Sequence, residues 1–472
     1  MALSTIDIII IVLYMAGMLL LGFLSKSRVD DMDDFILGGK RFTTFALTGT
    51  IMATMVGSGM TIGSVGNAYE FGITGTVFWV YLGFSVGLIT FAFMSEKVRQ
   101  TNARTMAEMI YIKYGSCARL VASIVIIAYA VSIVAINIAG LRTVILTIFG
   151  DSINISIPLL TAIATLFAIF YTSNGGLYAV VWMDTIQLWI IIIGILFAGL
   201  IIGVLGAGGI GHISDTFESL GLSVSNPFAT GFSASSLGFF LAYFLTVPAD
   251  PAMPQRALSG KNDMVVKRAF FISSIMGLLF GLGLLLIGTS ARIIYPDLPN
   301  RELALTHFIL HSYPPILKGI TVVGIFGAIM SSFDSFLVLA TTHVIYDVGT
   351  IMKKTFDEKT TKKILSIGTI IIGLIGLCIA LFITSLFNYL YMVFSVIGSS
   401  LVPALIGGLY FEDKVTSVAA ITSMIVGALV PAVLYLTVGY DVFLGDPVFL
   451  GIITSTFMLV IISLLTKKTS IE

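Results

Sequence analysis

Four small polar residues lie together in the middle of an otherwise apolar stretch, residues 324–346. They are Ser331, Ser332, Asp334 and Ser335. Positions 328, 331, 332 and 335 are three and four residues apart, so they share one face of a helix. A carboxylate at the centre of a bilayer is costly unless a partner, an ion or water compensates its charge. Several oxygens on one helix face are therefore typical of one half of a cation site.

The chain that carries these residues is far more apolar than a soluble protein. Of its 472 residues, 57% are hydrophobic and only 11% are charged, whereas soluble domains have roughly 25% charged residues. The formal net charge is zero, so nothing indicates binding to nucleic acid. We expect a single all-α polytopic membrane domain over residues 1–472.

A helix that spans a bilayer needs about 20 mainly apolar residues. Thirteen segments meet this requirement: 6–24, 43–68, 73–94, 120–148, 156–172, 178–205, 235–255, 268–290, 315–346, 363–385, 388–410, 416–437 and 446–465. We predict a short external helix for residues 297–313.

The distribution of Lys and Arg predicts the orientation of these segments. If the N-terminus lies outside, almost all of the 25 Lys and Arg residues fall on the inner side. The exceptions are Arg292, Arg301 and Lys318 outside, and Arg142 within a span. Cytoplasmic loops carry an excess of Lys and Arg, so we expect the C-terminus in the cytoplasm and the chain in the inner or plasma membrane.

Two of the predicted helices contain residues that interrupt a helix. Segment 43–68 is rich in glycine, and segment 235–255 has three prolines around Asp250. Freed backbone groups persist in a membrane only where protein, water or a ligand satisfies them. The breaks are five helices apart in oppositely directed segments, which indicates an inverted repeat with a site at the midplane. The alternative is a pair of packing kinks, because Gly and Pro are common in transmembrane helices.

Four motifs occur in an order known from one family. They are Phe35-Ile-Leu-Gly-Gly-Lys-Arg41, the stretch from Gly175 to Gln187, Gln255-Arg-Ala-Leu-Ser-Gly-Lys-Asn262 and Ala328-Ile-Met-Ser-Ser332. With them, the chain from Phe35 to Tyr410 resembles the sodium:solute symporter family, the relatives of the sodium/proline, pantothenate, sugar and sialic acid symporters.

The resemblance implies a LeuT-type fold of two inverted five-helix repeats. The repeats would be 43–205 and 235–410, with one extra helix at 6–24 and two C-terminal helices within 416–465.

The resemblance also implies a set of sodium ligands. They would be the backbone carbonyls of Ala53, Val56 and Ala328 and the hydroxyls of Ser331 and Ser332. The physics agrees, because a broken helix offers carbonyls that a continuous helix would use internally. The alternative is that both serines bond only to a neighbouring helix, which is worth about 0.6–2 kcal/mol each.

Some relatives have a second sodium site, formed by an Asp of the fifth core helix and hydroxyls of the eighth. Asp184 matches that Asp, and Ser331 and Ser335 match hydroxyls, but Asp334 stands at another partner position. Two carboxylates near one cation bind it more tightly, or share a proton in its absence. The hypothesis is a second cation site, or a proton-linked site, at Asp184, Asp334 and Ser335. Alternatively, one carboxylate faces a solvated vestibule.

The implied fold places a substrate beside the two breaks. Candidate residues are Met55, Gly59, Met60, Asn137, Phe244, Thr246, Asp250 and Tyr391. Met55 stands where the sodium/proline type has an Asp, and Gly59 and Met60 replace a Glu-Gln pair of the sugar-transporting members. A sugar needs several fixed polar partners, so these departures make a sugar substrate less favoured.

Two charged residues bear on the class of the substrate. An ionised Asp250 would favour a substrate amine, or it could be held by helix-end amides or by Gln255 and Arg256. Arg142 could receive a carboxylate, but we favour its snorkelling to the membrane interface.

The sequence therefore predicts a secondary active symporter. It would couple inward sodium flux to uptake of a small organic solute, with an amino acid or small carboxylate favoured. Alternatives are a sugar or polyol symporter, a proton-coupled symporter, or a non-transporting membrane sensor with the same fold. No nucleophile–base pair or metal cluster occurs at one depth, so we do not expect an enzyme. The expected partners are sodium, the solute and membrane lipid, and the expected state is a monomer.

Overall fold

The structure is a computed structural model of the whole chain. It describes residues 3–25, 36–72, 76–149, 156–172, 176–222, 226, 234–349, 358–439 and 446–466. Phe35 and Gly175, the first residues of two motifs, lie outside the described residues.

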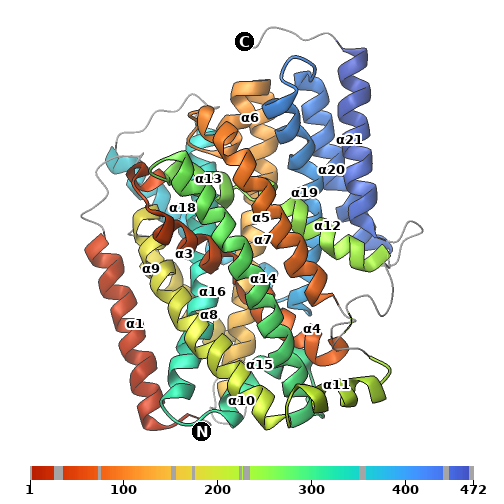
Figure 1. Cartoon of the computed structure of the whole chain (residues 1–472). Helices are drawn as coiled ribbons and strands as arrows, with labels where there is room; N and C mark the ends of the chain where they lie inside the picture. The colour runs from red at the N-terminus through yellow and green to blue at the C-terminus, as the bar shows by residue number, and fades with distance from the viewer. Residues whose placement is uncertain are drawn as a thin grey trace.

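The described residues form a bundle of helices, most of which run along a common direction (Figure 1). The long helices and their continuations are α1 Thr5–Ser25, α3 Thr44–Met55, α4 Ser64–Phe71, α5 Val77–Gln100, α7 Ser116–Phe149, α8 Ile157–Thr172, α9 Gly176–Ile191, η5 Ile192–Phe197, α10 Ala198–Gly206, α12 Ala234–Ala249, α13 Ala252–Ser259, α14 Asp263–Ile294, α16 Leu317–Thr342, η7 His343–Val348, α18 Glu358–Ala380, α19 Leu386–Tyr410, α20 Ser417–Thr437 and α21 Pro447–Leu465. Shorter elements are η2 Gly38–Lys40, η3 Gly59–Gly63, α6 Met106–Tyr114, α11 Ile210–Ser219, η6 Arg301–Leu303 and α15 Ala304–Ser312.

Each predicted spanning segment overlaps at least one of these helices. Within the described residues, eight helices are long and apolar enough to cross a membrane, or nine if the bent pair α3–α4 is one span. Four shorter apolar helices accompany them, in α1, α8, α12 and α18. The exact count of thirteen spans stays a prediction. The external helix predicted at 297–313 is divided into η6 and α15.

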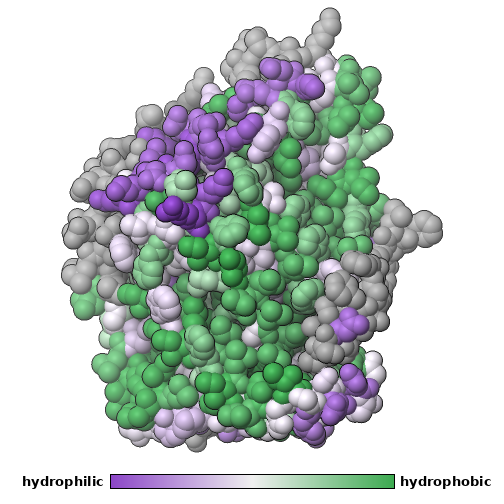
Figure 2. All heavy atoms as spheres, viewed as in Figure 1, coloured by the Kyte–Doolittle hydropathy of each residue, from purple (hydrophilic) through white to green (hydrophobic). Residues whose placement is uncertain are grey.

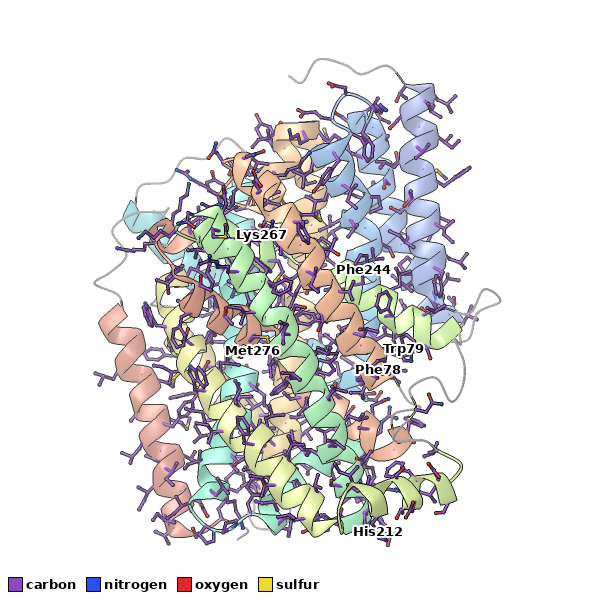
Figure 3. All side chains as sticks on the ribbon, viewed as in Figure 1. Phe78, Trp79, His212, Phe244, Lys267 and Met276 are labelled. Atoms are coloured by element: carbon purple, nitrogen blue, oxygen red, sulfur yellow. The ribbon has the colours of Figure 1, made fainter. Side chains whose placement is uncertain are left out.

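The two ends of the bundle differ in polarity. Figure 2 shows a broad hydrophobic band with hydrophilic residues gathered mainly at the upper end and in a smaller group at the lower right. Lys267, which we predicted to be inside, lies toward the upper end, and His212 lies at the lower end (Figure 3). Helix α1 starts at the lower end and α21 finishes at the upper end, as an odd number of crossings requires (Figure 1).

Helix α16 is the most enclosed of the long helices. In the apolar part of the span Leu317–Val348, which is α16 with its continuation η7, 94% of the residues are buried. The corresponding fraction for α21 is 22%. It packs against α7, α9 and α3. The polar residues 331–335 therefore lie inside the protein and do not face lipid.

Both predicted helix breaks are confirmed. Helix α3 ends at Met55, and the segment Gly59–Phe71 continues after a bend of 66°. Helix α12 ends at Ala249 and α13 begins at Ala252. Asp250 stands between them, and its Oδ1 accepts from the Ala252 N–H at 2.8 Å. The side chain thus satisfies a donor that α13 cannot satisfy internally.

Candidate functional site

The break after α3 exposes backbone groups that a continuous helix would pair. In such a helix the Ser58 N–H would donate to the Thr54 carbonyl. Here it donates instead to Oδ1 of Asn137 on α7, at 3.1 Å. The amide of Asn137 is oriented in turn, since its Nδ2 donates to the Ile133 carbonyl at 2.9 Å. Asn137 thereby holds the break open and leaves the Thr54 carbonyl without its helical partner.

Two hydroxyls of α16 reach the carbonyls of this break. Ser331 Oγ donates to the Ala53 carbonyl at 2.8 Å and lies 3.2 Å from the carbonyl of Ala328. Ser332 Oγ donates to the Thr54 carbonyl. Ala53, Ala328 and Ser331, three of the predicted sodium ligands, thus come together through direct contacts.

The other two predicted ligands lie next to this group. Val56 follows the last residue of α3, and its backbone angles (φ −84°, ψ 43°) leave the helical region. Ser332 lies against the break, because a Cβ built on Gly57 would be 2.7 Å from its Oγ. Only uncharged oxygens are offered at this point, and sodium is a hard cation that binds oxygen dipoles. The residues present therefore fit a sodium ion.

A second polar cluster lies one turn earlier in α3, at Thr50 and the side chain of Thr54. Asp184 of α9 is buried, and its Oδ2 accepts from Thr50 Oγ1 at 2.6 Å and from Thr54 Oγ1 at 3.3 Å. Thr54 Oγ1 is also 3.2 Å from Ser335 Oγ on α16. Asp184 and Ser335, which we predicted in one site, are therefore bridged by a threonine of the broken helix.

The sequence did not predict the cation that occupies this cluster. Arg256 of α13 is completely buried, and its Nη2 donates to Thr54 Oγ1 at 2.8 Å and to Ser335 Oγ at 2.9 Å. The same nitrogen is 4.0 Å from Asp184 Oδ2. We considered Arg256 only as a partner for nearby Asp250. Arg256 belongs to the motif Gln255–Asn262, and this was the available signal that it has a role in the site.

Asp334 also belongs to α16, where it follows Ser331 by three residues. It is buried, and it interacts electrostatically with Tyr14 of α1, as Asp184 also does. Its direct participation with Asp184 in one cation site stays a hypothesis.

A small cavity adjoins the α3 break. Its volume is about 20 Å³, enough for one water molecule and well below the roughly 300–1,000 Å³ of ligand pockets, so a solute would enter only after the site widens. Five predicted substrate residues line it: Met55, Gly59, Met60, Asn137 and Asp250. Ser332 and Thr54 line it as well, so the cavity and the predicted sodium site share a wall.

One carboxylate oxygen in this cavity has no hydrogen-bond partner among the described residues. Asp250 is completely buried, and its Oδ2 is left over after Oδ1 has capped α13. The nearby hydroxyl of Tyr129 interacts with this carboxylate, although the two groups do not meet hydrogen-bond geometry. A buried polar group without a partner calls for a ligand, an ion or a water.

Aromatic rings that we did not predict complete the cavity. The ring of Tyr129 is 5.5 Å from that of Phe336 and 6.3 Å from that of Phe394, centroid to centroid. All three rings line the cavity. Tyr129 lies on the same face of α7 as Asn137, at helical spacing through Ile133, so periodicity could have identified it.

The remaining predicted substrate residues lie outside this cavity. Phe244, labelled in Figure 3, is half-buried on α12 and stacks on Phe240 with centroids 6.0 Å apart. Thr246 Oγ1 donates to the carbonyls of Ala242 and Phe394, at 2.7 and 3.2 Å. The Tyr391 hydroxyl donates to Asp446. These residues have structural partners.

Arg142 likewise has backbone partners. Its guanidinium donates to the carbonyls of Ala380 and Ile383, at 3.2 and 2.8 Å. It therefore closes the end of α18 and does not line the cavity.

Comparison with known proteins agrees with this architecture. The model of the sodium:solute symporter family matches residues 35–427. The chain is 25% identical to the sodium/pantothenate symporter of Haemophilus influenzae, over 89% of this chain and 88% of that protein. It is 22% identical to the sodium/proline symporter of Escherichia coli, over 91% of this chain and 88% of that protein.

A solved structure shares the fold over almost the whole length. It is the substrate-bound outward-open state of a Na⁺-coupled sialic acid symporter, with a TM-score of 0.84, 21% identity and 99% of both chains covered. The LeuT-type fold class that the resemblance implied is thereby confirmed. The boundaries of the two inverted repeats stay a prediction.

Proposed function

This chain belongs to the sodium:solute symporter family, and we propose that it couples inward sodium flux to uptake of a small solute with an amino group, such as an amino acid. Sodium as the coupling ion agrees with the sodium-coupled relatives. The observation that carries the solute class is the buried Asp250 carboxylate at the cavity, whose Oδ2 meets hydrogen-bond geometry with no group among the described residues and interacts with the Tyr129 hydroxyl.

We assign the sodium ion to the carbonyls of Ala53, Val56 and Ala328 and the hydroxyls of Ser331 and Ser332. The support is the group of contacts at the α3 break, where Ser331 already joins two of the carbonyls. Each hydroxyl can turn its proton away and present its oxygen to an ion. The ion would then hold the broken helix against α16.

The shared wall supports coupling between ion and solute. Ser332 lines the cavity and also donates to the Thr54 carbonyl of the break. An ion that orders this segment therefore orders part of the solute site, and a solute that orders the cavity prepares the ion site. Such coupling is reciprocal in free energy.

The chemistry of the cavity supports an ammonium group. The Asp250 carboxylate supplies the opposite charge, and the rings of Tyr129, Phe336 and Phe394 can contact a cation with their faces. The lining residues include no Lys or Arg, so a solute with only a carboxylate finds no countercharge there.

Other functions receive less support. Proton coupling would use a buried carboxylate, for which Asp184 and Asp334 are the candidates. A sensor without turnover would keep the same site, so only flux separates it from a transporter. The relatives are transporters, and we propose that this chain is a transporter and not an enzyme.

We also propose the surroundings of the protein. It lies in the inner or plasma membrane as a multi-pass monomer surrounded by lipid, with the N-terminus outside and the C-terminus in the cytoplasm. The Lys and Arg pattern supports this orientation.

The test is a thermal-shift screen followed by flux. Amino acids, amines, carboxylates and sugars are added to purified protein in sodium buffer, because a ligand selective for the folded state stabilises it. The ligand with the largest shift is then used for counterflow and sodium-driven uptake in proteoliposomes. We expect an amino-bearing solute, with binding reduced at least tenfold in Asp250→Asn and retained in Asp263→Asn, which alters an exposed carboxylate. A preferred solute without an amino group would refute the solute class, and absence of sodium-driven uptake would refute symport.

A further inference from the structure

The buried guanidinium of Arg256 lies where the sequence predicted part of a second sodium site. Its Nη2 is within 3 Å of Thr54 Oγ1 and Ser335 Oγ, and 4.0 Å from Asp184 Oδ2. Both Asp184 and Ser335 were candidate ligands of a second cation. The positive charge thus stands among the oxygens that an ion would use.

We propose that Arg256 is a tethered cation that takes the place of a second sodium ion, so that the chain binds one sodium. This inference rests on the proposed function for the identity of the first ion, but it concerns a different set of residues. It gives the Asp184–Ser335 cluster the role of holding a side-chain charge.

The ion pair of Arg256 with Asp184 supports this assignment, and the guanidinium also attracts the buried Asp250 carboxylate. A buried carboxylate needs a countercharge, and Asp184 has the guanidinium of Arg256 at ion-pair distance. An additional sodium between Asp184 and Ser335 would lie close to a like charge in a site of low dielectric, where repulsion is strong. The hydroxyl of Ser335 also already accepts a hydrogen bond from the guanidinium.

The tether distinguishes this cation from a free ion. Arg256 belongs to α13, the continuation of the second broken helix, and it contacts residues of α3, α9 and α16. It therefore connects the two broken helices with the two helices that flank them. A sodium ion at this position would leave on each transport cycle, whereas the guanidinium stays with the chain.

The test counts sodium ions without any solute. Radioactive sodium is bound to purified wild-type protein at increasing concentration, with potassium replacing sodium to keep ionic strength constant. We expect one sodium per chain and a non-cooperative binding curve. Two sodium ions per chain would overturn the inference while leaving sodium binding, and so the proposed function, intact. No specific sodium binding at all would overturn both.

Variants test the tether itself. In Arg256→Ala, the uncompensated Asp184 is expected to admit a second sodium, or a guanidinium ion added to the buffer. The double variant Asp184→Asn with Arg256→Ala should return to one sodium. Arg119→Ala removes a different buried arginine, paired with Asp347, and should leave the count at one. A folded Arg256→Ala protein that takes up neither cation would contradict the proposal. If that variant does not fold, the wild-type count still decides.

Discussion

The hydroxyl of Ser331 donates to the carbonyl of Ala53 over 2.8 Å, although 278 positions separate the two residues in the chain. One belongs to the continuous helix α16 and the other to the last turns of the broken helix α3. The contact brings oxygens of the two helices together at the point where α3 is interrupted. An ion bound there would connect the two helices more strongly than the hydrogen bond does.

Removal of the Ser331 hydroxyl is expected to weaken sodium binding. Ser331→Ala deletes one oxygen ligand, and a hydrogen bond to a charged group is worth about 1.5–3 kcal/mol. We therefore predict an increase of about tenfold or more in the sodium concentration for half-maximal binding. Ser400→Ala is the matched control, because Ser400 also donates to a backbone carbonyl within the buried bundle, that of Met424, at 2.8 Å. Equal effects of the two substitutions would show that Ser331 acts only through packing.

The absence of a side chain at Gly57 keeps the break accessible. A Cβ at this position would be 2.7 Å from Ser332 Oγ and 3.1 Å from Asn137 Oδ1. Gly57→Ala is expected to displace both groups and to lower sodium and solute affinity at least tenfold, with an overpacking cost of about 1–3 kcal/mol. Gly17→Ala is the control, since its Cβ would meet nothing within 4 Å. Binding isotherms and the unfolding midpoint measure the two effects. Wild-type affinities in Gly57→Ala would refute the proposed geometry.

A buried ionic cluster joins α7 to the end of α16. Asp347 accepts from Arg119 Nε at 2.8 Å and from Thr105 Oγ1 at 3.0 Å, and its Oδ2 is 2.7 Å from His343 Nδ1. Asp347→Asn leaves the Arg119 charge buried without its counter-ion, which costs about 3–5 kcal/mol. We predict a clearly lowered unfolding midpoint.

The control for this cluster is an exposed ion pair. The Asp263 side chain is 61% exposed and pairs with Arg99, so Asp263→Asn should change stability by about 1 kcal/mol or less. A similar midpoint for Asp347→Asn and Asp263→Asn would contradict the role of the buried cluster.

Glu302 lies outside the spanning helices, and burial raises the pKa of its carboxyl above the ordinary 4.5. Because the folded state then binds the proton more tightly than the unfolded state, stability falls as pH rises from about 4.5 through the raised pKa. In Glu302→Gln this contribution disappears, while the amide oxygen can still accept from the Leu386 N–H. The difference in unfolding midpoint between variant and wild type should grow with pH in this window. Glu70→Gln, at an exposed side chain, is the control, and parallel curves for Glu302→Gln and wild type would refute the prediction.

The helix breaks and the two serines could be predicted because their causes are local. Clustered glycines and prolines weaken a helix through its own backbone, although single prolines such as Pro403 and Pro431 lie inside the helices α19 and α20. Ser331 and Ser332 share a face by spacing alone. The family resemblance then supplied their partners Ala53 and Val56. The contact of Ser331 with Ala53 agrees with that assignment.

Other parts of the site depend on contacts that spacing does not encode. Arg256 is close to Asp250 in sequence and attracts its carboxylate, but its two shortest hydrogen bonds go to Thr54 and Ser335. Tyr391 was expected at the substrate, yet its hydroxyl donates to Asp446. Asp446 is the N-cap residue of α21, which lies outside the ten-helix core that we predicted. We assigned roles to both side chains from their positions in the chain, but their hydrogen-bond partners come from distant parts of the sequence.

The most direct test of the account measures solute binding with and without sodium. The amino-bearing solute selected by the thermal-shift screen is titrated into purified wild-type protein in sodium and in potassium at equal ionic strength. Coupling energies of roughly 1–3 kcal/mol correspond to about 5–150-fold, and we predict at least a fivefold lower Kd in sodium, lost in Ser331→Ala. The same Kd in both salts would contradict the claim that ion and solute meet at the broken helix.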